Sequence, residues 1–273
     1  MNVEALPYTV LLLLLQAGCG HTLVTVALDW RGNTTRGFIR LGAAIAIVSV
    51  AAGLWLAFML AFDGPIGDYP IRTGLGPAVR GLTVVLMALS LAYTTAAWRG
   101  RNRGSLLLGA GAAAAALALL GVLSAVLAPP TWGYPGVLLA LLAGSLTLGL
   151  VNMAMSLGHW YLVTPRLPER PLVELTVVLM AAIAAQGAIV FVNAVIPAAQ
   201  VVTSGLSIGE NPAFWLRIVV GIVFPSALAY MAWRTARERG MMSATGLLYI
   251  AVGAVLAGET LARGLLLTTA VAA

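Results

Sequence analysis

Two histidines, His21 and His159, stand out in this sequence because each lies within a long apolar segment. An ionisable ring in such a segment is costly to bury unless a partner or ligand satisfies it. Neutral imidazole is the commonest metal ligand in proteins, and two imidazoles can supply both axial ligands of a haem iron. The sequence therefore predicts that His21 and His159 hold one haem b between them.

Small residues precede each histidine by one and by three positions. Small side chains let helices approach closely, and here they are expected to leave a flat recess for a porphyrin face beside each imidazole. Two tyrosines lie at comparable depth in later apolar segments and are expected to face the same cofactor. Besides the histidines, the predicted cofactor site comprises Gly18, Gly20, Ser156, Gly158, Tyr93 and Tyr230.

Other interpretations of the histidines stay open at this point. A zinc or copper site would require further Cys, His or carboxylate ligands. Two chlorophylls, each bound by one histidine, would satisfy both rings. The imidazoles could also serve only as hydrogen-bonding groups between packed helices.

A second candidate site is formed by Glu259 and Arg263, which are four residues apart in the last apolar segment. This spacing places both side chains on one face of a helix, where they can pair. One interpretation is a proton-accepting carboxylate beside a quinone site. The alternative is a self-neutralising pair near the membrane interface. Four amides, at Gln16, Gln186, Asn152 and Asn193, are expected to form hydrogen bonds between helices.

The composition requires a membrane environment for these groups. Apolar residues make up 61% of the 273 residues and charged residues only 9%, whereas soluble domains carry about 25% charged residues. A helix needs about 20 apolar residues to cross a bilayer, so the sequence predicts an all-α integral membrane protein. Eight segments qualify: 8–29, 37–62, 78–98, 105–128, 137–163, 172–197, 213–233 and 242–270.

The basic residues indicate how these spans are oriented. All 15 basic residues are arginine, and ten lie in the loops that follow spans 1, 3, 5 and 7. By the positive-inside rule these loops are cytoplasmic, which places both termini on the outer, periplasmic side of the inner membrane. This distribution is a topology signal and predicts no nucleic-acid partner. Arg80 and Arg217, just inside spans 3 and 7, are expected to snorkel to the outer interface.

Recurring motifs predict an internal duplication. Gly20-His21 returns as Gly158-His159, and Arg80 returns as Arg217 at nearly the same offset. A Leu-Ala-Tyr motif and a Trp-Arg pair follow each of these arginines. The sequence thus predicts two parallel four-helix repeats, residues 1–136 and 137–273, related by a pseudo-two-fold axis along the membrane normal.

Together these patterns favour a cytochrome-b-like membrane subunit, itself more a carrier of electrons than a catalyst. It would link a peripheral subunit of a redox complex to the quinone pool through the bis-histidine haem. One alternative is a secondary transporter built on parallel repeats, which discontinuous helices and buried charges in the membrane would favour. Another is a pigment-binding or structural subunit of a membrane complex.

Overall fold

The computed structural model describes residues 3–128, 133–164, 167–195 and 208–271. These residues form eight apolar helical segments long enough to cross a membrane, and no β-strand occurs among them. Each of the eight predicted segments is helical, with ends within four residues of the predicted ones. Their bounds are α1 Leu6–Arg31, α2 Arg36–Met59, α3 Gly76–Arg99, α4 Arg103–Leu127, α5 Gly133–Val163, α6 Arg170–Val195, an interrupted seventh span from Pro212 to Arg237, and α9 Met241–Thr269.

Local signals in the sequence account for several helix ends. The side chain of Thr35 caps α2 by accepting a hydrogen bond from the Phe38 amide. Asn102 and Ser105 form a reciprocal capping box at the start of α4. Gly32 ends α1 in the left-handed conformation, with φ of 66°, which glycine adopts without a steric penalty.

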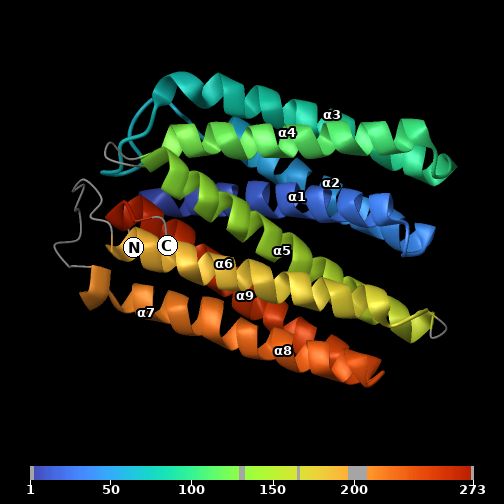
Figure 1. Ribbon diagram of the computed structural model, residues 1–273. Coiled ribbons are helices and arrows are strands. Elements are labelled where there is room, and N and C mark those ends of the chain that lie inside the picture. Colours follow the sequence, from blue (N-terminus) through green and yellow to red (C-terminus); the bar gives the residue numbers. More distant parts are fainter. Residues whose placement is uncertain (1–2, 129–132, 165–166, 196–207, 272–273) are drawn as a thin grey trace.

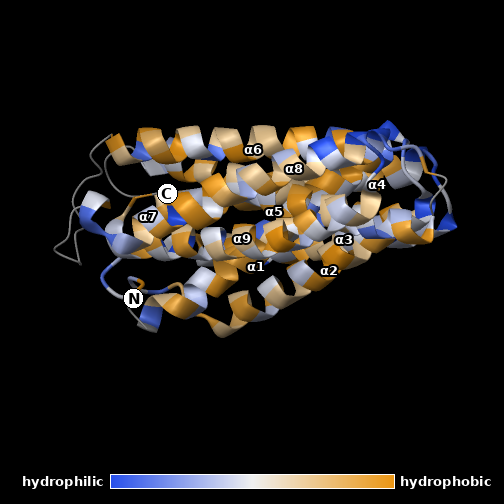
Figure 2. Ribbon diagram, turned by 90° about the horizontal axis from the view of Figure 1, so that it is seen from below, coloured by the Kyte–Doolittle hydropathy of each residue, from blue (hydrophilic) through white to orange (hydrophobic). Residues whose placement is uncertain are grey.

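The helices run side by side in one elongated bundle, and the two chain ends lie at the same end of it (Figure 1). Figure 2 shows hydrophilic residues gathered at the ends of the bundle and hydrophobic residues along the helices between them. In α1 and α5, 72% of the most apolar 18-residue stretch is buried, against 28–39% in the other six spans. These two helices therefore form the centre, and the other six leave much of their apolar surface facing outward, where it can contact lipid.

Each central helix has a corresponding set of neighbours. Helix α1 packs against α2 and α4, and α3 bridges those two helices on the outside. In the same way α5 packs against α6 and α9, and α8 (Phe224–Arg237) bridges that pair. The two central helices also pack against each other, which joins the halves of the bundle.

Helices α1 and α5 cross with their backbones in direct contact. A Cβ atom on Gly20 would overlap the carbonyl of Ser145, and one on Gly149 would overlap the carbonyl of Gly20. Further along the same interface, the hydroxyl of Thr25 contacts the sulfur of Met153 at 3.8 Å. These contacts run in one direction along both helices, so α1 and α5 are parallel.

The seventh span is not a continuous α-helix. It consists of α7 (Pro212–Ile218), a π-helix (Val219–Val223) and α8, which carries Pro225 in its first turn. Proline has no amide hydrogen and clashes with the carbonyl four residues earlier, here that of Gly221. A π-helical turn directly precedes Pro225 and accommodates this misfit.

The connection between α2 and α3 is hydrogen-bonded to the end of α4. The Tyr69 hydroxyl donates a hydrogen bond to the Leu127 carbonyl at 2.5 Å, and Ile66 and Tyr69 pair through their backbones. Burial raises the pKa of Tyr69 above its usual value, because the phenolate would lose its hydration. The hydroxyl thus remains a donor throughout the physiological pH range.

A substitution that adds a single methyl group tests the close crossing of α1 and α5. Gly20→Ala should lower the free energy of unfolding by about 1–3 kcal/mol, because the methyl must push the two backbones apart. Gly253→Ala is the matched control, since nothing lies within 4 Å of a Cβ at that position of α9. Thermal unfolding in detergent checks the difference, and equal melting temperatures for the two variants would contradict the close crossing.

Candidate functional site

A cluster of charged and amide side chains is enclosed within the bundle, near the end that holds both termini. Glu259 of α9 lies at its centre, and its Oε1 accepts hydrogen bonds from Gln186 of α6 and from Arg217 of α7, the latter at 3.2 Å. Its Oε2 accepts a hydrogen bond at 3.1 Å from Arg263, one turn further along α9. The three charged side chains are completely buried.

The central helices close the cluster from the other side. A side chain at Gly144 of α5 would overlap the Glu259 carboxylate, so only glycine leaves room for it there. Beside it lies the amide of Gln16 from α1, which is also fully buried and donates a hydrogen bond to the Leu141 carbonyl at 3.2 Å. Five helices therefore converge on one carboxylate.

The Arg217 guanidinium occupies space left by two glycines. Gly221 of the π-helix and Gly258 of α9 lie against each other, and a Cβ on Gly221 would overlap the Arg217 side chain. The π-helical turn thus brings the seventh span close to α9 at the level where Arg217 reaches Glu259. The helix interruption and the buried charge belong to one structural feature.

The cluster carries an excess of positive charge. Two guanidinium groups face one carboxylate, which leaves one positive charge uncompensated by these side chains. Nε and Nη1 of both Arg217 and Arg263 are buried and have no hydrogen-bond acceptor within the described part of the chain. Buried charged donors without acceptors are strongly unfavourable, so this arrangement is suited to receiving an anion.

Sequence-based expectations for these residues are confirmed in part. The pairing of Glu259 with Arg263 and the interhelical hydrogen bonds of Gln16 and Gln186 are present. Asn152 instead bonds the Leu148 carbonyl within its own helix. Asn193 is buried in α6.

The expectation that Arg217 snorkels to the interface is wrong. Its side chain turns inward to Glu259, where an ion pair and the space beside Gly221 hold it. Arg80, its counterpart in the sequence pattern, is half-buried and donates to the carbonyls of Ala57 and Leu60, both at 2.9 Å. The sequence pattern alone gives no signal that distinguishes these two arginines.

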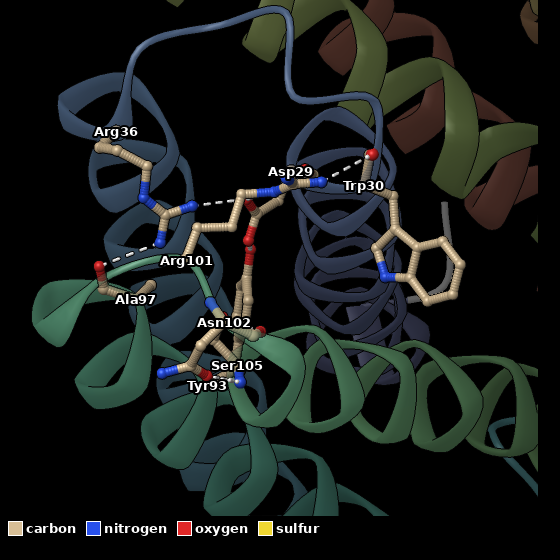
Figure 3. A network of polar contacts seen from close by, with 8 residues as sticks. All are labelled: Asp29, Trp30, Arg36, Tyr93, Ala97, Arg101, Asn102 and Ser105. Atoms are coloured by element: carbon tan, nitrogen blue, oxygen red, sulfur yellow. Dashed lines mark hydrogen bonds and ion pairs between the residues drawn. The ribbon is translucent and has the colours of Figure 1, made fainter.

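A second polar network lies at the opposite end of the bundle and was not predicted (Figure 3). Asp29 of α1 is buried, and its Oδ1 lies 2.5 Å from Nη1 of Arg36, while its Oδ2 accepts a hydrogen bond from Tyr93 at 2.9 Å. Arg101 donates to the backbone carbonyls of Asp29 and Trp30, at 3.2 Å each. An acidic residue near the end of an apolar span, followed by arginines in the next loops, was the available signal.

Glu174 lies at this same end and pairs with two arginines. It contacts Arg31 at 2.6 Å and Arg170 at 2.7 Å. Arg40 instead lies over the Trp98 ring and donates to the Trp98 carbonyl. The Arg31–Glu174 pair joins α1 to α6 and so links the two halves of the bundle.

The two histidines lie in different surroundings. His21 is buried in α1, and neither ring nitrogen has a partner with hydrogen-bond geometry in the described residues, although the Ala17 carbonyl lies one turn earlier. His159 is exposed near the end of α5, with Nδ1 3.5 Å from the Tyr249 hydroxyl of α9.

The parallel packing of α1 and α5 separates the histidines along the bundle. The contact of Gly20 with Ser145 and Gly149 places His21 level with about residue 148 of α5. His159 lies eleven residues further along, which corresponds to about 16 Å at 1.5 Å per residue. Two axial ligands of one iron must lie on opposite faces of a single porphyrin, so these two residues do not fit a shared haem.

Neighbouring helices fill the space beside the small residues that precede the histidines. Gly18 packs against Val50 of α2, Gly20 against α5, and Gly158 against Thr245 of α9, so they form no recess between the central helices. Ser156 is buried in α5. Tyr93 is bound to Asp29, whereas Tyr230 is exposed and packs against Trp233. The predicted cofactor residues are thus not brought together around one site.

Comparison with known proteins gave no matching family model, no matching curated protein and no matching solved structure. In the described ranges, no group of three or more His, Cys, Asp or Glu side chains is placed to hold a metal ion.

The Asp29 network is expected to hold the first four helices together. Asp29→Asn should lower the free energy of unfolding by about 1–3 kcal/mol, because it removes the charge that two arginines share while keeping the shape of the side chain. The control is Glu238→Gln, whose pair with Arg234 is exposed and should contribute almost nothing. Chemical or thermal unfolding in detergent measures both, and an equal effect would contradict the structural role of Asp29.

The histidine geometry makes a spectroscopic prediction. We expect the purified protein to lack a reduced-minus-oxidised haem b band that depends on both His21 and His159, since one porphyrin cannot reach both rings. Visible spectra of the wild-type protein, His21→Ala and His159→Ala provide the measurement. A haem b band that is abolished by each single substitution would overturn this expectation.

Proposed function

We propose that this protein is a membrane carrier that binds a small anion at the cluster of Arg217, Glu259 and Arg263. The observation that carries the proposal is the buried excess of positive charge, with guanidinium nitrogens that have no acceptor among the described residues. Ionisable residues within membrane spans usually mark a binding or transport pathway, because they are costly to keep there. A bound anion would neutralise the cluster and accept hydrogen bonds from both arginines.

Each residue of the cluster has a distinct role in this proposal. Arg217 and Arg263 bind the anion through their Nε and Nη1 groups, which have no acceptor in the part of the chain that the structure describes and act as charge-assisted donors. Glu259 holds both guanidinium groups in place through separate oxygen atoms, and it also competes with the anion for them. Gln186 fixes the carboxylate from α6.

The interrupted seventh span supports a carrier over a rigid anchor. Transporters commonly place their substrate sites at discontinuous helices, where the backbone can rearrange without loss of a long helix. Here Arg217 lies in the last turn of α7, two residues before the π-helix, and Gly221 of the π-helix contacts Gly258, the residue that precedes Glu259. A change in this turn would directly alter the distance between Arg217 and the carboxylate.

We further propose that the two halves are parallel repeats, as the corresponding neighbours of α1 and α5 suggest. The packing favours an offset of about 127 residues between these two helices. That offset aligns Val10-Leu-Leu with Val137-Leu-Leu, and it aligns His21 with Leu148. In this alignment the two Gly-His pairs are not equivalent, and the binding cluster belongs to the second repeat together with Gln16 of the first.

The cytochrome-like function has less support. It requires His21 and His159 to bind one iron, and their separation does not fit that arrangement. A quinone at Glu259 and Arg263 would still leave positive charge uncompensated, whereas an anion would neutralise it. With the arginine-rich loops on the cytoplasmic side, the anion site would lie in the outer half of the membrane.

Anion binding to the purified protein in detergent tests this proposal. Isothermal titration with chloride, phosphate, sulfate, acetate and succinate should identify at least one saturable ligand. Arg217→Gln should weaken its binding about 10- to 100-fold, because a charge-assisted pair of donors is lost. Glu259→Gln should strengthen binding, because it removes the competing negative charge while keeping the shape of the side chain.

Controls separate binding from folding. Arg80→Gln removes an arginine of the opposite half that donates to the carbonyls of Ala57 and Leu60 and lies outside the cluster, so it should leave the affinity unchanged. Arg217→Lys keeps the charge if the glutamine variant does not fold. Proteoliposome uptake of the best ligand then measures transport. Equal affinities in wild-type protein and Arg217→Gln, or no saturable anion, would reject the proposal.

A further inference from the structure

We infer that a groove between α1, α5 and α6 binds one acyl chain of an anionic phospholipid. The groove has a volume of about 330 Å³ and lies at the end of the bundle opposite the anion cluster. Leucines from α1 and α5 form its floor, including Leu23, Leu28 and Leu150, and Val178 lies on its α6 wall. This site is independent of the proposed anion site.

The groove has the length and the opening expected for a chain from one leaflet. It extends along α1 from Arg31 to Leu23 and along α6 from Glu174 to Ala182, which is about 12 Å in each helix at 1.5 Å per residue. Half of a hydrocarbon core measures about 15 Å. Because Ala27 and Ala181 are exposed along its edges, the groove opens to the outside of the bundle.

On the other side of the central pair, side chains fill the corresponding space between α2 and α5. There α2 packs closely against α5, since Gly37 contacts the Trp160 ring and Gly42 contacts the Met153 side chain. Between α1 and α6 the groove has no aromatic or Met side chain among its described lining residues, and away from Arg31, Asn33 and Glu174 its lining is aliphatic. The groove is therefore a specific feature of this side and not a general property of the bundle.

Charge at the open end favours an anionic headgroup. Arg31 and Arg170 both pair with Glu174, so two guanidinium groups share one carboxylate and leave one positive charge. The Asn33 amide also donates to Glu174, at 3.4 Å, and lines the groove. A phosphate at this position would meet Arg31 while its acyl chain occupied the apolar part below.

Native mass spectrometry of the full chain tests this inference with phosphatidylglycerol and phosphatidylcholine vesicles as lipid sources. We expect one phosphatidylglycerol per chain, retained at least tenfold more than phosphatidylcholine. Ala181→Phe should abolish this retention by filling the groove. Ala184→Phe is the matched control, because Ala184 is exposed on α6 outside the groove.

A second pair of variants tests whether lipid binding requires the positive charge of Arg31. Arg31→Gln should bring retention of the two lipids to within about twofold, whereas Arg234→Gln, another exposed arginine at this end, should leave the preference intact. Equal retention of both lipids by the wild-type protein would overturn the inference. Equal loss of phosphatidylglycerol retention in Ala181→Phe and Ala184→Phe would also overturn it. So would a quinone bound to the chain in place of the phospholipid. None of these outcomes depends on anion binding at Arg217.

Discussion

The direct backbone contact between α1 and α5 is the constraint on which the rest of the bundle depends. Without Gly20 and Gly149 at the crossing, the two helices could not approach so closely. Their parallel alignment then sets the level of every side chain on the central pair. It places Gln16 and Gly144 beside Glu259, and it separates His21 from His159 along the bundle axis.

The buried cluster follows from this packing and from the shape of the seventh span. A carboxylate with a single arginine would be neutral, and such a pair could be a purely structural contact. A second arginine changes the electrostatics, because the group retains a positive charge where water is excluded. The π-helical turn beside Pro225 supplies both the space for Arg217 and a place where the backbone can rearrange. This combination distinguishes the cluster from the Asp29 network, whose arginines are partly exposed and whose donors largely have partners.

The bundle is also asymmetric in chemistry despite the matching arrangement of its helices. The buried carboxylate with two buried arginines lies among the last four spans, while the corresponding Arg80 binds backbone carbonyls at the end of α2. At the other end, the first four spans contain the buried Asp29, and the Arg31–Glu174 pair connects the halves. The cluster of Arg217, Glu259 and Arg263 and the network around Asp29 thus lie at opposite ends of the bundle.

The sequence by itself determined the eight helices and the pairing of Glu259 with Arg263. These features depend on hydrophobic length, on turn-forming residues and on the spacing of four residues within one helix, all of which are local. The tertiary structure decided that Arg217 turns inward, that Asp29 gathers its partners and that His21 and His159 lie apart. Those outcomes depend on the axial alignment of α1 with α5 and on contacts between helices distant in the chain. In helices so rich in leucine and alanine, several alignments satisfy the same apolar pattern, and only the close contact of specific glycines selects one.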